Sequence, residues 1–218
     1  MITAIIGVGN LGRALAGHLV AGDEVVVLAA RDEAHAAGLA QELGPRVEAA
    51  LVEDAIAAAD VVVLALWLDQ IKDVVPEQAH LLENKIVIDP SNPIGFEDGQ
   101  MVRTLPDGQS SGSVVASLLP ASARYVKAFG TLGADALANS ANREPRVALF
   151  YATDDDGAAG TVEQLIRAAG FDPVKAGGLA DAGRLEGPGG DLSQGGLNGE
   201  LLDLDQARTA VAAAEVTA

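Results

Sequence analysis

The sequence predicts an α/β fold, a doubly wound parallel sheet followed by a smaller α+β extension in the C-terminal part of the chain. Short apolar runs rich in β-branched residues alternate with helical patterns through the first half. One run, residues 61–66, contains no polar residue, which is typical of a central parallel strand covered on both faces. A glycine-rich turn joins the first run to the first helix. This alternation favours right-handed crossovers.

The first half divides into strands and helices in turn. We expect strands at residues 1–7, 24–29, 47–50, 61–66 and 85–89, and helices at residues 11–20, 34–43, 52–59, 69–75 and 77–83. Residues 95–113 are polar and contain glycine, so we expect a connecting loop there, followed by a helix at residues 114–119. We place a dinucleotide-binding domain at residues 1–120 and an acceptor-side or oligomerisation region at residues 121–218.

The second half has its own units. We expect strands at residues 124–129 and 146–151 and helices at residues 161–169 and 203–215, with Gly170 in the left-handed position that ends a helix. The first of these helices is preceded by Asp154, Asp155 and Asp156. We expect these carboxylates to cap the helix and interact favourably with its dipole, in preference to binding a metal. Residues 177–200 contain many glycines and few core residues, which indicates a functional loop or an arm onto a neighbour.

Composition narrows the classes of function. A net charge of −17 repels nucleic acid and anionic lipid, so neither is expected as a partner. The chain has no cysteine, and its histidines (His18, His35 and His80) lack ligand spacing, so we expect no metal site. The first residues lack a basic region before the early glycine, and no apolar run reaches the roughly 20 residues of a membrane span, so a cytoplasmic protein is expected.

The turn after the first strand contains the pattern G-x-G-x-x-G, formed by Gly7, Gly9 and Gly12. The first glycine permits a sharp turn, the second lets backbone amides approach a pyrophosphate, and the third lets the helix pack on the strand. The free amides at the helix N-terminus then hold the phosphates. This context predicts a Rossmann-type dinucleotide site, in preference to a merely structural turn. Asn10 could bind phosphate, cap the helix, or do both.

The end of the second strand selects the dinucleotide. NAD enzymes place an acidic residue there against the ribose 2′-hydroxyl, whereas this chain has Ala29, Ala30 and Arg31. An arginine attracts a 2′-phosphate, so NADP is expected. Asp32 and Glu33 follow and weaken the inference, and the alternative is that Arg31 is an ordinary solvated residue.

Three residues follow later strands, near the crevice where ligands bind in open sheets. Trp67 follows the fourth strand, where it could line the nicotinamide pocket or lie at the edge of the core. Asn92 and Pro93 follow the fifth strand in the same way. His18 lies on the face of the first helix that carries Leu11 and Leu15, so packing or surface exposure is favoured over catalysis.

Several segments together resemble the NADPH-dependent F-420 reductase family. They are G-V-G-N-L-G, the strand end A-A-R, D-P-S-N-P at residues 89–93, V-K-A-F-G-T at residues 126–131 and the D-D-D helix start, and the resemblance extends to about residue 186. In that family NADP(H) exchanges a hydride with the deazaflavin coenzyme F-420, and relatives include metalloreductase domains that use a flavin (FMN or FAD). The resemblance implies that NADP is bound by Gly7, Gly9, Asn10, Leu11, Gly12, Ala30 and Arg31, and that the nicotinamide is flanked by Ala65, Leu66, Asn92 and Pro93.

The same resemblance places Lys127, Gly130 and Thr131 on the side of the acceptor. It departs from the family pattern at Asp32, at Gly130, where relatives often carry a polar residue, and in the tail after Glu186. A homodimer is expected from the tail and the relatives.

Three functions remain open. The first is hydride transfer between NADPH and a deazaflavin or flavin, which requires no catalytic acid or base because the cofactors supply the chemistry. The second is reduction of a small carbonyl or imine, for which Lys127 or Tyr125 could donate a proton. The third is a non-catalytic NADP-binding sensor or regulatory subunit whose glycine-rich tail is an interaction arm.

Overall fold

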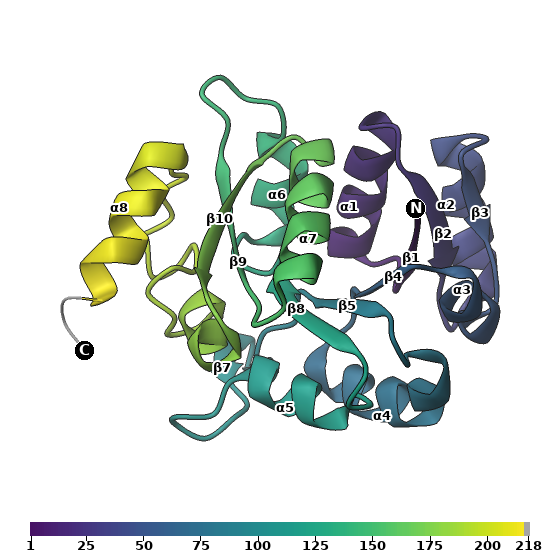
Figure 1. The fold of residues 1–218 in the computed structure, drawn as a ribbon, viewed down its shortest axis with the longest axis horizontal. Helices are drawn as coiled ribbons and strands as arrows, with labels where there is room; N and C mark the ends of the chain where they lie inside the picture. The colour runs from purple at the N-terminus through teal and green to yellow at the C-terminus, as the bar shows by residue number, and fades with distance from the viewer. Residues whose placement is uncertain (216–218) are drawn as a thin grey trace.

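The computed structural model describes residues 1–215 as one eight-stranded sheet with helices on both faces and a separate two-stranded hairpin (Figure 1). The strand order is β10-β9-β8-β5-β4-β1-β2-β3. The strands of the sheet are β1 (Ile2–Ile6), β2 (Val25–Ala29), β3 (Val47–Ala49), β4 (Val61–Leu64), β5 (Ile86–Asp89), β8 (Arg124–Ala128), β9 (Ala148–Ala152) and β10 (Asp172–Gly177). The helices are α1 (Asn10–Ala21), α2 (Glu33–Leu43), α3 (Val52–Ala58), α4 (Leu68–Gln78), α5 (Ser111–Leu118), α6 (Ala134–Ser140), α7 (Asp156–Ala168) and α8 (Leu204–Glu215).

The central strands from β3 to β8 are parallel, in the order typical of a Rossmann fold, which confirms the predicted fold class. Alternate residues of each strand enter two separate apolar clusters, because successive side chains point to opposite faces. Ile5 and Val63 lie in the cluster with α1, α2 and α7, whereas Ile6 and Val62 lie in the cluster with α3, α4 and α5. Both faces of the sheet are therefore buried.

The predicted strands and helices of the first half are confirmed, with shifted ends. Residues 65 and 66 lie beyond β4 and are free to line the crevice. The two helices expected between residues 69 and 83 form one helix, α4, followed by a short 3-10 turn at Ala79–Leu81. Pro76 lies inside α4, and the helix continues through it because Leu68, Ile71 and Val75 are buried on the sheet side.

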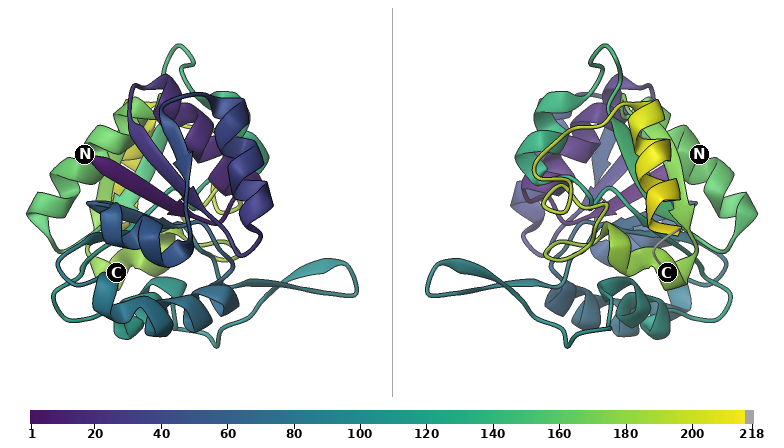
Figure 2. Two further views of the ribbon diagram at one scale, coloured as in Figure 1. Left: turned by 90° about the vertical axis from the view of Figure 1, so that its right-hand side faces the viewer. Right: turned by 90° about the vertical axis from the view of Figure 1, so that its left-hand side faces the viewer.

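The prediction of a connecting loop at residues 95–113 was wrong. β6 (Ile94–Glu97) and β7 (Gln100–Arg103) form an antiparallel hairpin, and Ser110 caps α5, which begins three residues earlier than expected. The turn residues Asp98 and Gly99 have positive φ, 50° and 78°, as a two-residue hairpin turn requires. Figure 2 shows this hairpin projecting from the body of the molecule.

The C-terminal part extends the same sheet. β8 pairs with β5 in parallel, β9 pairs with β8 antiparallel, and β10 pairs with β9 in parallel. The sequence analysis missed α6 and β10. The domain boundary at residue 120 remains a prediction, and residues 216–218 of the second region lie outside the described residues.

Residues 177–200 contribute more to the core than expected. A 3-10 helix spans Leu179–Leu185, and Leu185, Glu186, Leu192 and Ser193 are buried. The glycines allow the chain to fold back on itself, since a β-carbon at Gly190 or Gly196 would collide with backbone oxygens. Among residues 1–215, no helix is both long and apolar enough to cross a bilayer.

Candidate functional site

The strand order changes direction between β1 and β4, so the carboxyl ends of these neighbouring strands open the crevice in which α/β folds bind ligands. The β1–α1 turn lies on one side of this crevice. The segments after β4, β5 and β8 continue along the same edge of the sheet, because these strands run parallel. The predicted site residues are therefore placed along one edge by the topology.

The glycines of the β1–α1 turn differ in what surrounds them. Gly7 has φ +105°, and a β-carbon there would collide with the carbonyl oxygen of Ala65. A β-carbon at Gly12 would collide with the carbonyl oxygen of Gly7. A β-carbon at Gly9, in contrast, would meet no atom within 4 Å. Gly7 and Gly12 are required by packing, whereas Gly9 leaves room for a group that is not part of the protein.

The first turn of α1 supplies donors beside that space. Gly9 is the N-terminal cap residue, with no side-chain cap, and Asn10 is the first helical residue. The suggestion that Asn10 caps the helix was wrong, because the capping position belongs to Gly9. The first amides of a helix have no partner within it, so they suit a pyrophosphate. Arg13 is directed elsewhere, since its guanidinium pairs with Glu42 at 2.7 Å.

At the end of β2, Ala30 is partly buried and Arg31 is exposed. Within residues 1–215, the Arg31 side chain makes no hydrogen bond or ion pair, unlike Asp32 beside it. The Asp32 carboxylate caps α2 by accepting hydrogen bonds from the amides of Ala34 and His35 at 3.1 and 3.4 Å. The Asp32 carboxylate is thus held at the start of α2 and does not pair with Arg31. The Arg31 guanidinium is therefore available to a ligand phosphate.

The residues after β4 contact the turn directly. The Ala65 carbonyl oxygen and the Leu66 side chain lie against Gly7, where a β-carbon would be 2.9 Å from Leu66 Cδ2. Trp67 follows as the cap residue of α4, and 56% of its surface is exposed. Both interpretations of Trp67, as a wall of the nicotinamide pocket or as the edge of the core, therefore remain predictions.

A buried cluster of charges lies at the ends of β5 and β8. The Lys127 ammonium is 3.0 Å from Asp89 Oδ2 and 3.4 Å from Glu186 Oε1, and none of these side chains is more than 2% exposed. The ammonium also donates to the Ser111 hydroxyl at 2.8 Å and to the Ser91 carbonyl oxygen. We call Asp89, Lys127 and Glu186 the charge cluster. Asp89, the Ser91 carbonyl oxygen and the Ser111 hydroxyl together engage all three donors of the ammonium.

The two carboxylates have further partners. Glu186 accepts hydrogen bonds from the amides of Ser111 and Gly112, both at 2.8 Å, at the start of α5. Asp89 accepts from the Tyr125 hydroxyl at 2.8 Å. Burial raises the pKa of the Tyr125 hydroxyl well above its ordinary value, and the Asp89 carboxylate raises it further. The hydroxyl therefore stays protonated as a donor.

Asn92 connects the site to the tail. Its amide nitrogen donates to the Gly130 carbonyl oxygen at 2.9 Å, and its amide oxygen accepts from the Gly187 amide at 2.9 Å. Gly130 itself is required by packing, because a β-carbon there would collide with the Pro90 carbonyl oxygen. The Thr131 hydroxyl is buried and has no hydrogen-bond partner within residues 1–215. The structure thus brings together the predicted residues after β5 and β8.

The sequence analysis did not single out Asp89, Ser111 or Glu186 as members of one site. A signal was present, since Asp89 ends an otherwise apolar strand and Lys127 lies between the apolar residues Val126 and Ala128. In the structure the two residues are partners in the sheet. Glu186 carried no comparable signal, because the tail around it has no regular pattern.

Other predicted residues have structural roles. His18 Nε2 is 3.0 Å from the Leu137 carbonyl oxygen and its ring packs edge-on against Phe171, so it is packed as expected. Asp155 caps α7 through the Ala158 amide at 2.8 Å, which confirms helix capping. The Arg124 guanidinium, and next the Ala158 amide, hold the pKa of the Asp155 carboxyl well below its usual range. Among residues 1–215, no three His, Asp or Glu side chains are grouped as a metal site.

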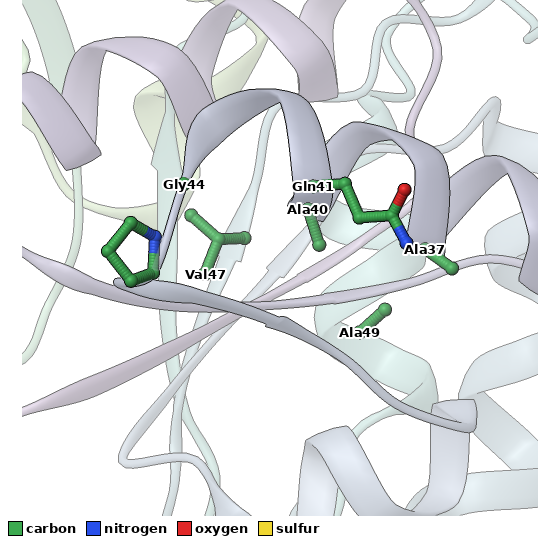
Figure 3. Close-up of a pocket in the computed structure, with 7 residues that line it drawn as sticks. Ala37, Ala40, Gln41, Gly44, Val47 and Ala49 are labelled. Atoms are coloured by element: carbon green, nitrogen blue, oxygen red, sulfur yellow. The ribbon is translucent and has the colours of Figure 1, made fainter.

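Two surface depressions lie apart from the strand-end crevice. One, of about 450 Å³, lies between α2 and β3 and is lined by Ala37, Ala40, Gln41, Gly44, Pro45, Val47 and Ala49 (Figure 3). The other, of about 720 Å³, includes Arg103, Ser110, Asp154 and Pro188. The first has no charged group to hold a phosphate, so we assign the site by the glycine turn instead.

Known proteins resemble this chain over most of its length. Metalloreductase STEAP3 of Rattus norvegicus is 32% identical over 182 residues, which cover 84% of this chain and 35% of the relative. The chain thus spans about a third of that relative. A hypothetical protein, SMa0349, from Sinorhizobium meliloti has 33% identity and a TM-score of 0.80, covering 93% of this chain and 95% of the other.

A crystal structure of a candidate F420-dependent NADP reductase from Arthrobacter sp. FB24 has 25% identity and a TM-score of 0.72, covering 83% of this chain and 86% of the other. The sequence profile of the family described as NADP oxidoreductase, coenzyme F420-dependent, matches residues 2–93, which contain the glycine turn, Arg31 and Asn92. Residues 2–93 of the chain thus match this family of coenzyme F420-dependent NADP oxidoreductases, and the Arthrobacter structure extends the similarity over most of the chain.

Proposed function

We propose that this protein binds NADP(H) at the β1–α1 turn and transfers a hydride between it and a flat-ring acceptor, a deazaflavin such as coenzyme F-420 or a flavin (FMN or FAD). One observation carries the dinucleotide assignment. Backbone atoms exclude side chains at Gly7 and Gly12, whereas the space over Gly9 is open beside the first amides of α1. This is the shape that a pyrophosphate requires.

The choice of NADP over NAD rests on Arg31. Its guanidinium is exposed and makes no ion pair in the part of the chain that the structure describes, while the neighbouring Asp32 carboxylate caps α2. An unpaired guanidinium can bind a 2′-phosphate through two parallel hydrogen bonds. The position where NAD enzymes place a carboxylate against the ribose 2′-hydroxyl has none here, since β2 ends at Ala29 and Ala30 follows it.

When bound, NADPH supplies a hydride from its nicotinamide, the acceptor ring takes the hydride and a proton from water, and NADP⁺ remains. The residues of the chain bind and orient the two partners. Ala65 and Leu66, with Pro93 beyond them, would flank the nicotinamide, and Thr131 would offer its unpartnered hydroxyl on the acceptor side. These residues could keep water away, because Pro93 and Thr131 are buried.

Reduction of a small carbonyl or imine is less well supported. It needs a proton donor that can reach the substrate. The Lys127 ammonium is enclosed by the charge cluster, and the Tyr125 hydroxyl donates to Asp89. Neither group is free to donate in this arrangement, which favours an acceptor that needs no acid from the protein.

Calorimetric titration of the protein with NADPH and NADH tests the cofactor. We expect NADPH to bind more tightly, and Arg31→Ala to weaken NADPH about tenfold or more while leaving NADH nearly unchanged, because only NADPH carries the 2′-phosphate. Arg46→Ala is the matched control, since Arg46 is an arginine of similar exposure that pairs with Asp23. Equal loss of both coenzymes in Arg31→Ala would refute the role of Arg31.

The acceptor is tested by mixing the protein and NADPH with F-420, FMN or FAD and following NADPH oxidation. We expect turnover with at least one of them. Tight NADPH binding without turnover of any acceptor would instead favour the sensor role. The homodimer also remains a proposal, to be tested by light scattering.

A further inference from the structure

We propose that Trp67, Phe96 and Met101 form the subsite that receives the planar ring of the hydride acceptor. This inference rests on the proposed function, because it names where the second ring lies relative to the dinucleotide. We call these three side chains the aromatic corner.

The aromatic corner is a continuous apolar surface. The rings of Trp67 and Phe96 have centroids 6.2 Å apart and planes at 82°, an edge-to-face arrangement. Phe96 and Met101 are directly opposite in the β6–β7 hairpin, so their side chains share one face of it. All three are more than half exposed, at 56%, 61% and 57%.

These residues are unusual in this chain. Aromatic residues make up only 3% of the sequence, and most large apolar side chains are buried. Among residues 1–215, Trp67 and Phe96 are the only aromatic side chains in the set of exposed large apolar residues, and they contact each other. Isolated exposed apolar residues need no explanation, whereas a contiguous group marks a binding surface.

The position of the aromatic corner connects it to the crevice. Trp67 directly follows Ala65 and Leu66, which lie against Gly7 of the phosphate-binding turn. The hairpin that carries Phe96 and Met101 begins at Ile94, immediately after Asn92 and Pro93. The aromatic corner therefore directly follows, along the chain, the two segments expected to flank the nicotinamide.

The geometry suits a flat, conjugated ring better than a compact substrate. Two aromatic rings at nearly a right angle offer one face for stacking and one edge for a perpendicular contact, and Met101 adds a polarisable thioether that favours aromatic neighbours. Hydride transfer between rings requires the acceptor ring to lie against the nicotinamide. A ring held by the aromatic corner satisfies both conditions from the open side of the crevice.

The chain contains one tryptophan, so its emission reports on this subsite alone. We would saturate the protein with NADP⁺ and titrate it with lumiflavin, the bare ring, and then with FMN, following Trp67 fluorescence. We expect saturable quenching by both. Phe96→Ala should weaken binding about 2-fold to 10-fold, because an aromatic contact of this kind contributes that much. Met101→Ala should have a smaller effect in the same direction.

The controls separate this inference from the proposed function. Val25→Ala removes an exposed apolar side chain at the amino end of β2 and should change nothing. Trp67→Phe should retain lumiflavin binding better than Trp67→Ala, as read from the fluorescence of the flavin itself. NADPH titrated by calorimetry should bind the wild type and Phe96→Ala within about twofold of each other.

Absence of quenching, or equal flavin affinity in wild type and Phe96→Ala, would overturn the aromatic corner while leaving dinucleotide binding intact. The proposal would also be overturned if Trp67 emission changed with protein concentration but not on addition of flavin. A second copy of the chain would then cover the surface. If calorimetry detected no heat of NADPH binding to the wild-type protein, the proposed function itself would be overturned.

Discussion

The β1–α1 turn and the charge cluster lie along one edge of the sheet, and they are built by opposite means. The turn owes its shape to missing side chains, with open space over Gly9 and backbone packed against Gly7 and Gly12. The cluster fills its space with Asp89, Lys127 and Glu186, all buried and all hydrogen-bonded or ion-paired. One part of the edge is thus kept open for a ligand, while the other is closed and holds loops in place.

Lys127→Met should destabilise the protein more than any other substitution considered below. Removing the ammonium leaves two buried carboxylates facing each other without a counter-charge, so the free energy of unfolding should fall by about 3–5 kcal/mol. Urea unfolding measures this. In the Lys127→Met background, Asp89→Asn should recover part of the loss, because it removes one uncompensated charge. A loss below about 1 kcal/mol would show that the cluster is not closed as described.

The same variant bears on mechanism. If the protein transfers a hydride between rings, Lys127→Met should leave NADPH binding intact in the folded fraction and weaken mainly acceptor binding. A steep fall in turnover with unchanged acceptor affinity would indicate that Lys127 donates a proton after all. Steady-state kinetics at a temperature well below unfolding distinguishes the two results.

Alanine at Gly12 and Gly9 should separate packing from binding. Gly12→Ala places a β-carbon against the Gly7 carbonyl oxygen, so we expect a loss of about 1–3 kcal/mol in thermal or urea unfolding. Gly9→Ala should cost about 1 kcal/mol or less, because alanine is a poorer N-terminal cap than glycine but its β-carbon would meet no atom within 4 Å. It should nevertheless weaken NADPH at least about tenfold by filling the pyrophosphate space. Equal affinity in Gly9→Ala would remove the main support for the site.

The smallest expected effect lies away from both regions, in the cap of α7. Asp155→Asn weakens the cap and the ion pair with Arg124, which is about one-third exposed, so we expect a loss of about 1 kcal/mol at neutral pH. The folded-state pKa of Asp155 is lowered, so its contribution is complete above the ordinary value of about 3.9 and is lost as pH falls through the folded value. The difference from wild type should begin to shrink below about pH 5 and continue to shrink until the pH falls below the lowered folded-state pKa. A difference that persists at the lowest pH would contradict the ion pair.

Local pattern predicted much of the fold. Residues 61–66 read as a buried strand because a strand covered on both faces has no place for a polar side chain, and β4 is the central strand beside β1. The hairpin was missed although Asp98-Gly99 is a strong turn signal, because the flanking strands have only four residues each and mix apolar with charged or polar residues. α6 and β10 were missed for a similar reason, since their few apolar residues do not form a clear period.

Local sequence was enough to predict the glycine turn and the arginine after β2, because each depends on residues that are close along the chain, and the alternation of strand and helix patterns indicated the parallel sheet. The folded packing was needed to show that Lys127 lies between Asp89 and Glu186, and that Trp67 contacts Phe96. Those contacts join segments that are far apart in the sequence. The order of the strands brings some of them together, and the tail after β10 folds back against the others. Whether each buried charge finds a partner depends on how the whole chain packs, and no local sequence pattern specifies that packing.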